Sequence, residues 1–243
     1  MQPPAAETGS GPAFSGVRQH LIVDADDTLW ENNVYFERAL AEFVEFLDHS
    51  TLNADQIRAV LDEIELANRQ THGYGAENFA RNLRQCYERL VERAISGADL
   101  ERVMSLAHRI LEQPVELIEG VAETLRYLHP RHDLLLFTKG HSEEQKLKID
   151  RSGLAPYFRH TAIVKEKDVA SYRGLVERCG LEPRRTWMIG NSPRSDINPA
   201  LELGLNAVYI PHPRTWSLEA EEIRHGPGRL LVLQKFSALR SYF

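Results

Sequence analysis

Short apolar runs that each end at polar residues recur along this chain, and they constrain its fold more than any other feature. The first run covers residues 20–23 and ends at the acidic sequence Asp24-Ala25-Asp26-Asp27-Thr28. Similar runs cover residues 134–137, 162–164, 187–189 and 207–210. Segments with helical periodicity separate them, at residues 119–128, 168–179 and 195–203. Strands that alternate with helices predict an α/β fold, in which helices cover both faces of a parallel sheet.

The interval from residue 32 to residue 116 breaks this alternation. It contains no convincing strand but four stretches with helical periodicity, at residues 34–47, 54–67, 77–95 and 99–111. A helical block between the first and second strands indicates an inserted subdomain. The sequence therefore predicts three parts: a flexible tail rich in Pro, Gly and Ser at residues 1–17, a core at 18–31 and 117–243, and a helical subdomain at 32–116.

Composition and charge argue against several classes of protein. The 243 residues carry a formal net charge of -6, which disfavours a nucleic-acid partner because phosphate backbones require a basic surface. Cys86 and Cys179 are the only cysteines and provide no disulfide framework. No apolar run approaches the length of about 20 residues that spans a bilayer, and the N-terminus lacks the pattern of a secretory signal. We expect a cytoplasmic protein with no membrane partner, and nothing in the sequence specifies an oligomeric state.

In open parallel sheets, ligands bind outside the carboxyl ends of the strands. Asp24 and Asp26 follow the first predicted strand, and Asp196 follows the fourth. Two ionised carboxylates roughly 4 Å apart repel by about 4 kcal/mol at an effective dielectric constant of about 20, so such a cluster needs a cation or a proton. Oxygen ligands favour magnesium, and the sequence has no HExxH motif that would favour zinc. The alternative is that Asp26, Asp27 and Thr28 only cap a turn.

Four motifs occur in one order along the chain: LIVDADDTL, LLLFTKG, IVKEKD and WMIGNSPRSD. Together they resemble the haloacid dehalogenase superfamily, whose motifs are a strand followed by DxDx(T/V), a strand ending in Thr or Ser, a lysine, and a final acidic motif. The resemblance covers residues 18–30 and 119–210. It implies a Rossmann-like core, a helical cap inserted after the first strand, and phosphoryl transfer through an aspartyl-phosphate.

The resemblance also implies a role for each matching residue. Asp24 would be the nucleophile and a metal ligand, while Asp26 would be the general acid and base and would reach the metal through its backbone carbonyl. Thr138 and Lys167 would hold the phosphoryl oxygens, and Asp196 would complete the Mg²⁺ site. Because Asp26 must carry a proton in the first step, we expect its surroundings to raise its pKa.

Three positions leave alternatives open. Asn191 stands where the family often has Asp, so the site has one negative charge fewer; we place Asn191 in the metal site, where it would orient a metal-bound water or contact Lys167. Lys165 and Lys167 both follow the third predicted strand, and the spacing to Gly190 favours Lys167 as the phosphate ligand. Lys139 lies after the second strand, where it either binds substrate or is a surface charge.

The function predicted from these features is a magnesium-dependent phosphatase acting on a small phosphorylated metabolite. Relatives that cleave carbon–halogen bonds lack an acid at the position of Asp26, so its presence favours phosphate esters. The cap would select the substrate, with Tyr74, Asn78, Arg81 and Arg84 as candidate contacts. Two alternatives remain, a sugar phosphomutase with the same nucleophile and a catalytically silent protein that binds a phosphorylated ligand.

Overall fold

The computed structural model describes residues 16–243, apart from the side chain of Gln70. Of the predicted tail at residues 1–17, only Gly16 and Val17 fall within this range, and the rest of that prediction lies outside the described residues. Within the described part of the chain, no helix is both long and apolar enough to cross a bilayer.

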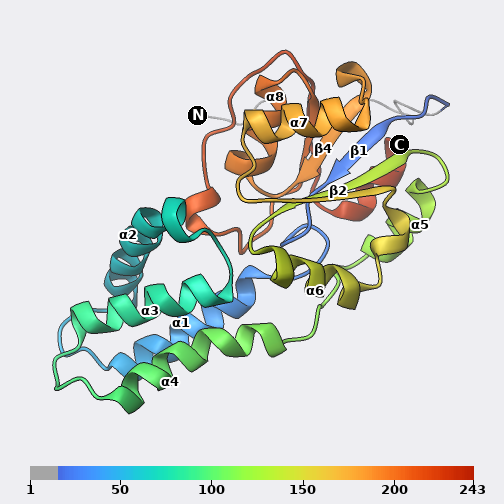
Figure 1. Cartoon of the computed structure of the whole chain (residues 1–243). Helices are drawn as coiled ribbons and strands as arrows, with labels where there is room; N and C mark the ends of the chain where they lie inside the picture. Colours follow the sequence, from blue (N-terminus) through green and yellow to red (C-terminus); the bar gives the residue numbers. More distant parts are fainter. Residues whose placement is uncertain (1–15) are drawn as a thin grey trace.

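The described chain alternates strands and helices around one inserted helical block (Figure 1). The strands are β1 (His20–Val23), β2 (Asp133–Lys139), β3 (His160–Val164), β4 (Thr186–Gly190), β5 (Asn206–Tyr209) and β6 (Leu230–Val232). The α-helices are α1 (Asn33–Leu47), α2 (Ala54–His72), α3 (Ala76–Leu90), α4 (Gly97–His108), α5 (Val121–Leu128), α6 (Ser142–Ser152), α7 (Val169–Cys179) and α8 (Asn198–Glu202). Short helical turns are η1 (Arg109–Glu112), η2 (Ala155–Tyr157), η3 (Pro183–Arg185), η4 (Pro193–Ile197), η5 (Ser217–Glu219) and η6 (Phe236–Ser241).

The six strands form one parallel sheet in the order β3-β2-β1-β4-β5-β6. The strand β1 lies between β2 and β4, and its last residue, Val23, pairs with Leu136 and Ile189. The residues that follow these three positions therefore emerge at the same edge of the sheet. This arrangement confirms the α/β fold with a parallel sheet, and it places the loop after β1 at the centre of that edge.

Alternate residues of the central strands pack on opposite faces of the sheet, as the two-residue period of a strand requires. On one face, Leu21 and Trp187 belong to a buried cluster with α5, α6 and the C-terminal η6. On the other face, Ile22 and Met188 pack with Tyr172 of α7. Figure 1 shows α7 and α8 on one side of the sheet and α5 with the chain terminus on the other. Burial on both faces explains why the strands are continuous apolar runs.

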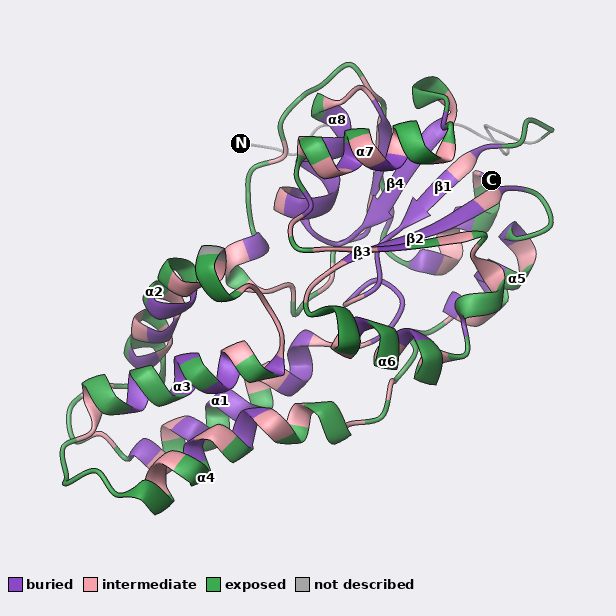
Figure 2. Cartoon of the chain, viewed as in Figure 1, coloured by how far each residue is buried: buried purple, intermediate pink, exposed green. Residues whose placement is uncertain are grey.

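The helices α1 to α4 form a second body with a core of its own. Phe43 of α1, Leu61 of α2, Leu83 of α3 and Val103 of α4 are fully buried against one another. Figure 2 shows buried residues along the inner faces of these helices and exposed residues on their outer faces. By contrast, α5 packs on the sheet. The helical segment between β1 and β2 is thus an inserted cap, as the sequence indicates.

Two elements of the core are absent from the sequence-based prediction. The helix α6, between β2 and β3, is so polar that its sequence shows no clear apolar face. Only Gln145 and Ile149 of this helix are buried. The edge strand β6 is a short apolar run of three residues, and none of them is fully buried. The helix α6 matters for function, because it carries two residues that contact Asp26.

Candidate active site

Three charged side chains, Asp24, Lys167 and Asp196, form a buried cluster at the carboxyl edge of the sheet. The Lys167 ammonium contacts Asp24 Oδ1 and lies 2.8 Å from Asp196 Oδ1. The side chains of Lys167 and Asp196 are 1% exposed and that of Asp24 is 9% exposed. One positive charge is therefore shared between two carboxylates in a place that water hardly reaches. The structure brings together Asp24, Lys167 and Asp196, as the motif order leads one to expect, and leaves Lys165 out of the cluster.

Local backbone geometry fixes Asp196 in this cluster. The element η4 is a π-helical turn, a conformation often found at functional sites. The Ser192 amide donates a hydrogen bond to Asp196 Oδ2 over 3.0 Å. A Cβ atom at Gly190 would lie 2.2 Å from the same oxygen, so only glycine fits at the end of β4. The carboxylate therefore faces Lys167 and not the solvent.

The cluster carries more negative charge than Lys167 neutralises. Burial, with a further contribution from the Asp24 charge, raises the pKa of Asp196 to about 7 in spite of Lys167. Burial alone would lower the pKa of Lys167, but the charges of Asp196 and Asp24 outweigh it and raise that pKa above its ordinary value. A divalent cation beside the two carboxylates would offset the remaining charge.

Asn191 completes a set of oxygen donors next to Asp24. The Thr28 hydroxyl lies 2.9 Å from Asp24 Oδ2 and 3.2 Å from Asn191 Oδ1, and its single proton is shared between them. The Asn191 amide group donates to Thr215 Oγ1 over 3.0 Å, which orients Asn191 Oδ1 towards the motif loop. Asp24, Asn191 and Asp196 thus offer only oxygen atoms, and this donor set suits Mg²⁺.

Asp26 lies in different surroundings, and the expectation that its pKa is raised is wrong. The Lys148 ammonium of α6 lies 2.5 Å and 2.7 Å from its two carboxylate oxygens, and Gln145 Nε2 and Trp30 Nε1 each donate to it over 2.8 Å. Burial alone would raise the pKa of Asp26, but the Lys148 charge and these hydrogen bonds outweigh it and lower the pKa below its ordinary value. Asp26 is therefore an ionised carboxylate here, not the protonated acid expected from sequence.

The predicted phosphate contacts divide into two groups. Thr138, near the end of β2, is buried and donates to Gln145 Oε1 over 3.2 Å, so Gln145 links it to Asp26. Lys139 is engaged elsewhere: its ammonium lies 2.5 Å from Glu219 Oε1 and 2.7 Å from Ser195 Oγ. Since Ser195 belongs to η4, we interpret Lys139 as a residue that stabilises this turn.

Glu219 organises the side chains behind Asp196. It accepts hydrogen bonds from Lys139, from Ser192 Oγ over 2.6 Å and from Ser195 Oγ over 2.5 Å. Burial alone would raise the pKa of Glu219, but Lys139 and the two hydroxyls outweigh it and bring that pKa to about 2. Since Ser192 also donates its amide to Asp196, this buried carboxylate holds the turn that presents a site residue.

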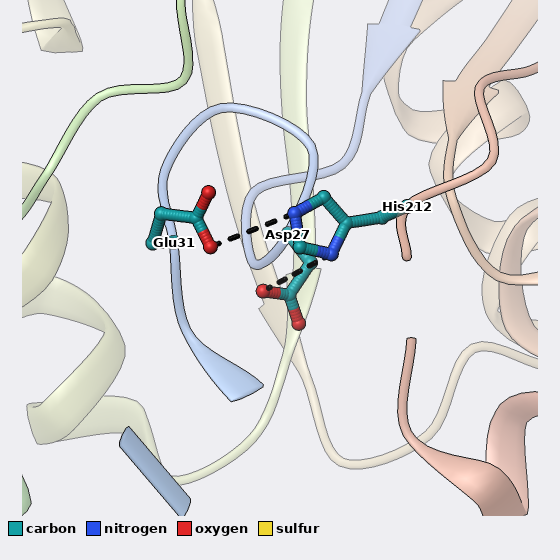
Figure 3. A group of neighbouring side chains, drawn as sticks. All are labelled: Asp27, Glu31 and His212. Carbon is teal, nitrogen blue, oxygen red and sulfur yellow. Dashed lines mark ion pairs between the residues drawn. The ribbon is translucent and has the colours of Figure 1, made fainter. Parts of the chain in front are cut away.

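Asp27, Glu31 and His212 also lie close together (Figure 3). Asp27 has a φ of 59°, and its Oδ1 accepts hydrogen bonds from the amides at positions 32 and 33 over 2.9 Å and 3.0 Å. His212 Nδ1 accepts from the Arg214 amide over 3.3 Å, which puts the proton of a neutral imidazole on Nε2, 3.5 Å from Glu31. We interpret this group as a contact that fixes the motif loop, because both ring nitrogens and Asp27 already have partners.

A cavity of about 190 Å³ connects the cluster with the cap. Among the residues that line it are Asp24, Asp26, Asp196 and, from the cap, Tyr74 and Asn78. Two hydrogen bonds join the cap to the core beside the cavity: Tyr74 Oη donates to Glu166 Oε2 over 2.6 Å, and the Ala76 amide donates to Glu144 Oε2 over 3.0 Å. The other two cap candidates from sequence, Arg81 and Arg84, form exposed pairs with Glu77 and Glu88 outside the cavity.

Sequence reasoning missed Gln145, Lys148 and Glu219. A helix signal did exist for the first two, since Glu143 and Glu144 occupy a first turn and Gly153 follows the last turn of α6. No local pattern marks Glu219, which lies in a short turn well after β5 and reaches Lys139 only through packing.

Comparisons with known proteins agree with this geometry. The family model of haloacid dehalogenase-like hydrolases matches residues 19–204, so the chain belongs to this family of hydrolases. A haloacid dehalogenase-like hydrolase from Xanthomonas campestris has a similar solved structure, with 30% identity, a TM-score of 0.79, and coverage of 99% of this chain and 94% of that one. The hydrolase YfnB from Bacillus subtilis, solved with bound magnesium, has 19% identity, a TM-score of 0.64, and coverage of 91% and 96%. A glyceraldehyde 3-phosphate phosphatase from Methanocaldococcus jannaschii is 23% identical over 211 residues, 83% of this chain and 89% of that protein.

Proposed function

We propose that this hydrolase is a magnesium-dependent phosphatase that removes the phosphoryl group of a small phosphorylated metabolite through an aspartyl-phosphate at Asp24. The observation that carries the proposal is the buried contact of Lys167 with both Asp24 and Asp196, with Asp26 across the same cavity. Two comparisons support it: one relative is named as a phosphatase, and another was solved with magnesium. Asp24, Asn191 and Asp196 would hold the ion, with the backbone carbonyl of Asp26.

In the first step, a carboxylate oxygen of Asp24 attacks phosphorus, and the bond from phosphorus to the ester oxygen breaks. The Lys167 ammonium and the Thr138 hydroxyl stabilise the charge on the phosphoryl oxygens, which is the main source of catalysis in such transfers. Bound magnesium would add a second source of positive charge. Asp26 takes a proton from the Lys148 ammonium, 2.5 Å from Asp26 Oδ1, and passes it to the leaving alcohol.

In the second step, water attacks the phosphorus and restores the Asp24 carboxylate. Asp26 accepts a proton from that water and returns it to Lys148, the bond between Asp24 and phosphorus breaks, and inorganic phosphate leaves. The ionised state of Asp26 beside Lys148 is the state that this step requires. A two-step route through a carboxylate divides one slow displacement into two easier ones.

The test is hydrolysis of an aryl phosphate by wild type and Asp24→Asn, with magnesium and with a chelator. We expect phosphate release that depends on magnesium and falls by at least about a thousandfold in Asp24→Asn, because the nucleophile is lost. Asp150→Asn is the matched control, since Asp150 is exposed on α6 and should retain wild-type activity. Measuring released inorganic phosphate also separates hydrolysis from transfer back to the substrate. Full activity of Asp24→Asn would overturn the proposal.

A further inference from the structure

The cap wall of the cavity contains three polar side chains that each have a hydrogen-bonding group without a partner among the described residues. Glu65 and Arg69 come from α2, and Asn82 comes from α3. All three line the same cavity as Asp24 and Asp196. They therefore face the part of a substrate that lies beyond its phosphoryl group.

Glu65 is the most unusual of the three. The residue is 8% exposed, and its Oε2 has no hydrogen-bond partner among the described residues. Burial, together with the charge of Asp62, raises the pKa of Glu65 to about 7, although Arg58 and the Trp216 side chain act in the opposite direction. A buried carboxylate oxygen without a donor is costly, and a donor from a bound molecule would satisfy it.

Arg69 and Asn82 provide the complementary groups. Within the described part of the chain, the guanidinium of Arg69 has no ion pair or hydrogen bond, whereas most arginines of the cap are paired. Asn82 is 7% exposed; its Oδ1 accepts from Asn68 over 2.9 Å, while its amide nitrogen has no acceptor among the described residues. A guanidinium and an amide N–H both bind a carboxylate.

Neighbouring polar side chains on the same wall are engaged, which separates them from these three. Arg58 pairs with Glu37, and the Asn78 amide donates to Tyr74 O over 3.1 Å. Within the described residues, Glu65, Arg69 and Asn82 thus offer the cavity one acceptor oxygen and two donor groups.

We propose that Glu65, Arg69 and Asn82 form a specificity site for a substrate whose leaving group carries a carboxylate and, beside it, a hydroxyl or ammonium group. The carboxylate binds Arg69 and Asn82, and the hydroxyl or ammonium group donates to Glu65. The substrate class is therefore the phosphate ester of a small hydroxy acid or amino acid. This inference rests on the proposed function, since it assigns the substrate of the same site.

Binding measurements on the Asp24→Asn protein test the inference without turnover. Calorimetry compares 3-phosphoglycerate, which has a carboxylate and a hydroxyl, with glycerol 3-phosphate, which lacks the carboxylate, and with 3-phosphooxypropanoate, which lacks the hydroxyl. O-phosphoserine and O-phosphoethanolamine form a second pair that differs by the carboxylate, and O-phosphoserine compared with 3-phosphooxypropanoate tests the ammonium donor. Each compound with both groups should bind about tenfold to a hundredfold more tightly than its partner.

Two matched pairs of variants in the Asp24→Asn background assign the effect to residues. Arg69→Gln should abolish the preference for the carboxylate, while Arg84→Gln, which removes an exposed arginine of α3, should retain it. Glu65→Gln should reduce the preference for the hydroxyl or ammonium group, while Glu63→Gln, at an exposed site on α2, should not. Thermal melting of each variant confirms that it is folded.

The outcomes separate the two proposals. Equal binding in every one of these comparisons, or the same loss in Arg69→Gln and Arg84→Gln, would overturn the specificity site. If the binding preferences hold but the aryl phosphate is not hydrolysed by wild type, the specificity site stands and the phosphatase proposal fails.

Discussion

Asp24 and Asp26 are two residues apart, yet the two sides of the site to which they belong differ in charge and in accessibility. On the sheet side, Asp24 and Asp196 share one ammonium, that of Lys167, in a buried cluster. On the helix side, Asp26 is the one carboxylate that pairs with Lys148 among the described residues, and its side chain is 22% exposed. The sheet side has an excess of negative charge that suits a metal ion, while the helix side is balanced and suits proton transfer.

The difference teaches how one loop serves two roles. The sheet side is built from strand ends, whose positions the hydrogen bonding of the sheet fixes. The helix side is built from α6, whose Gln145 side chain donates to Asp26, and from the cap, whose Ala76 amide donates to Glu144 of α6. Rigid groups can hold a phosphoryl group, and groups on a closing cap can admit and recognise a leaving group.

The largest expected effect on stability comes from removing the positive charge of the sheet side. Lys167→Met leaves two carboxylates buried without their cation, so the free energy of unfolding, measured by urea denaturation in the presence of a chelator, should fall by about 3–5 kcal/mol. Lys146→Met, at a pair whose lysine is 58% exposed, should change it by less than about 1 kcal/mol. Equal losses in the two variants would mean that the Asp24–Lys167–Asp196 cluster is not a buried ion cluster.

A second variant sharpens the comparison on the cap. The pKa of Glu65 is raised in the folded protein, so its ionisation opposes folding as the pH rises from about 4.5 through 7. Asp62 and Glu37 act in the same direction as burial, and Arg58 acts against it. Glu65→Gln should therefore stabilise the protein by up to about 3 kcal/mol near pH 8 and by little near pH 4. Urea denaturation at the two pH values measures this gain, and a gain that is the same at both would contradict the assignment.

The smallest expected effect concerns the support of the η4 turn. The pKa of Glu219 is lowered to about 2, so its contribution to stability is present above about pH 4.5 and is lost as the pH falls towards 2. Glu219→Gln should lower the free energy of unfolding by about 2 kcal/mol at neutral pH, and the deficit should shrink in acid. Glu222→Gln, at an exposed position nearby, serves as the control and should show neither change.

The sheet side of the site follows largely from the sequence, and the helix side does not. Asp24, Thr138, Lys167 and Asp196 each lie at or just beyond the end of an apolar run, and a parallel sheet brings such ends to one edge. Lys148 lies on α6, a polar helix without a clear apolar pattern, so its contact with Asp26 depends on packing.

For the same reason, the direction predicted for the pKa shift of Asp26 is wrong. Burial does act in the expected direction, but the partner that reverses the shift is 122 residues further along the chain. The sequence around a residue indicates whether that residue will be buried. It does not indicate which charge from a distant part of the chain will lie beside it.

The central claim is that Asp24 receives the phosphoryl group, and the most direct measurement is mass spectrometry of enzyme quenched in acid during turnover, with borohydride to trap an acyl phosphate. The account predicts that the modified residue is Asp24, and that the modification requires magnesium and is absent from Asp24→Asn. A reduced residue trapped at another position, or steady phosphate release by Asp24→Asn, would contradict it.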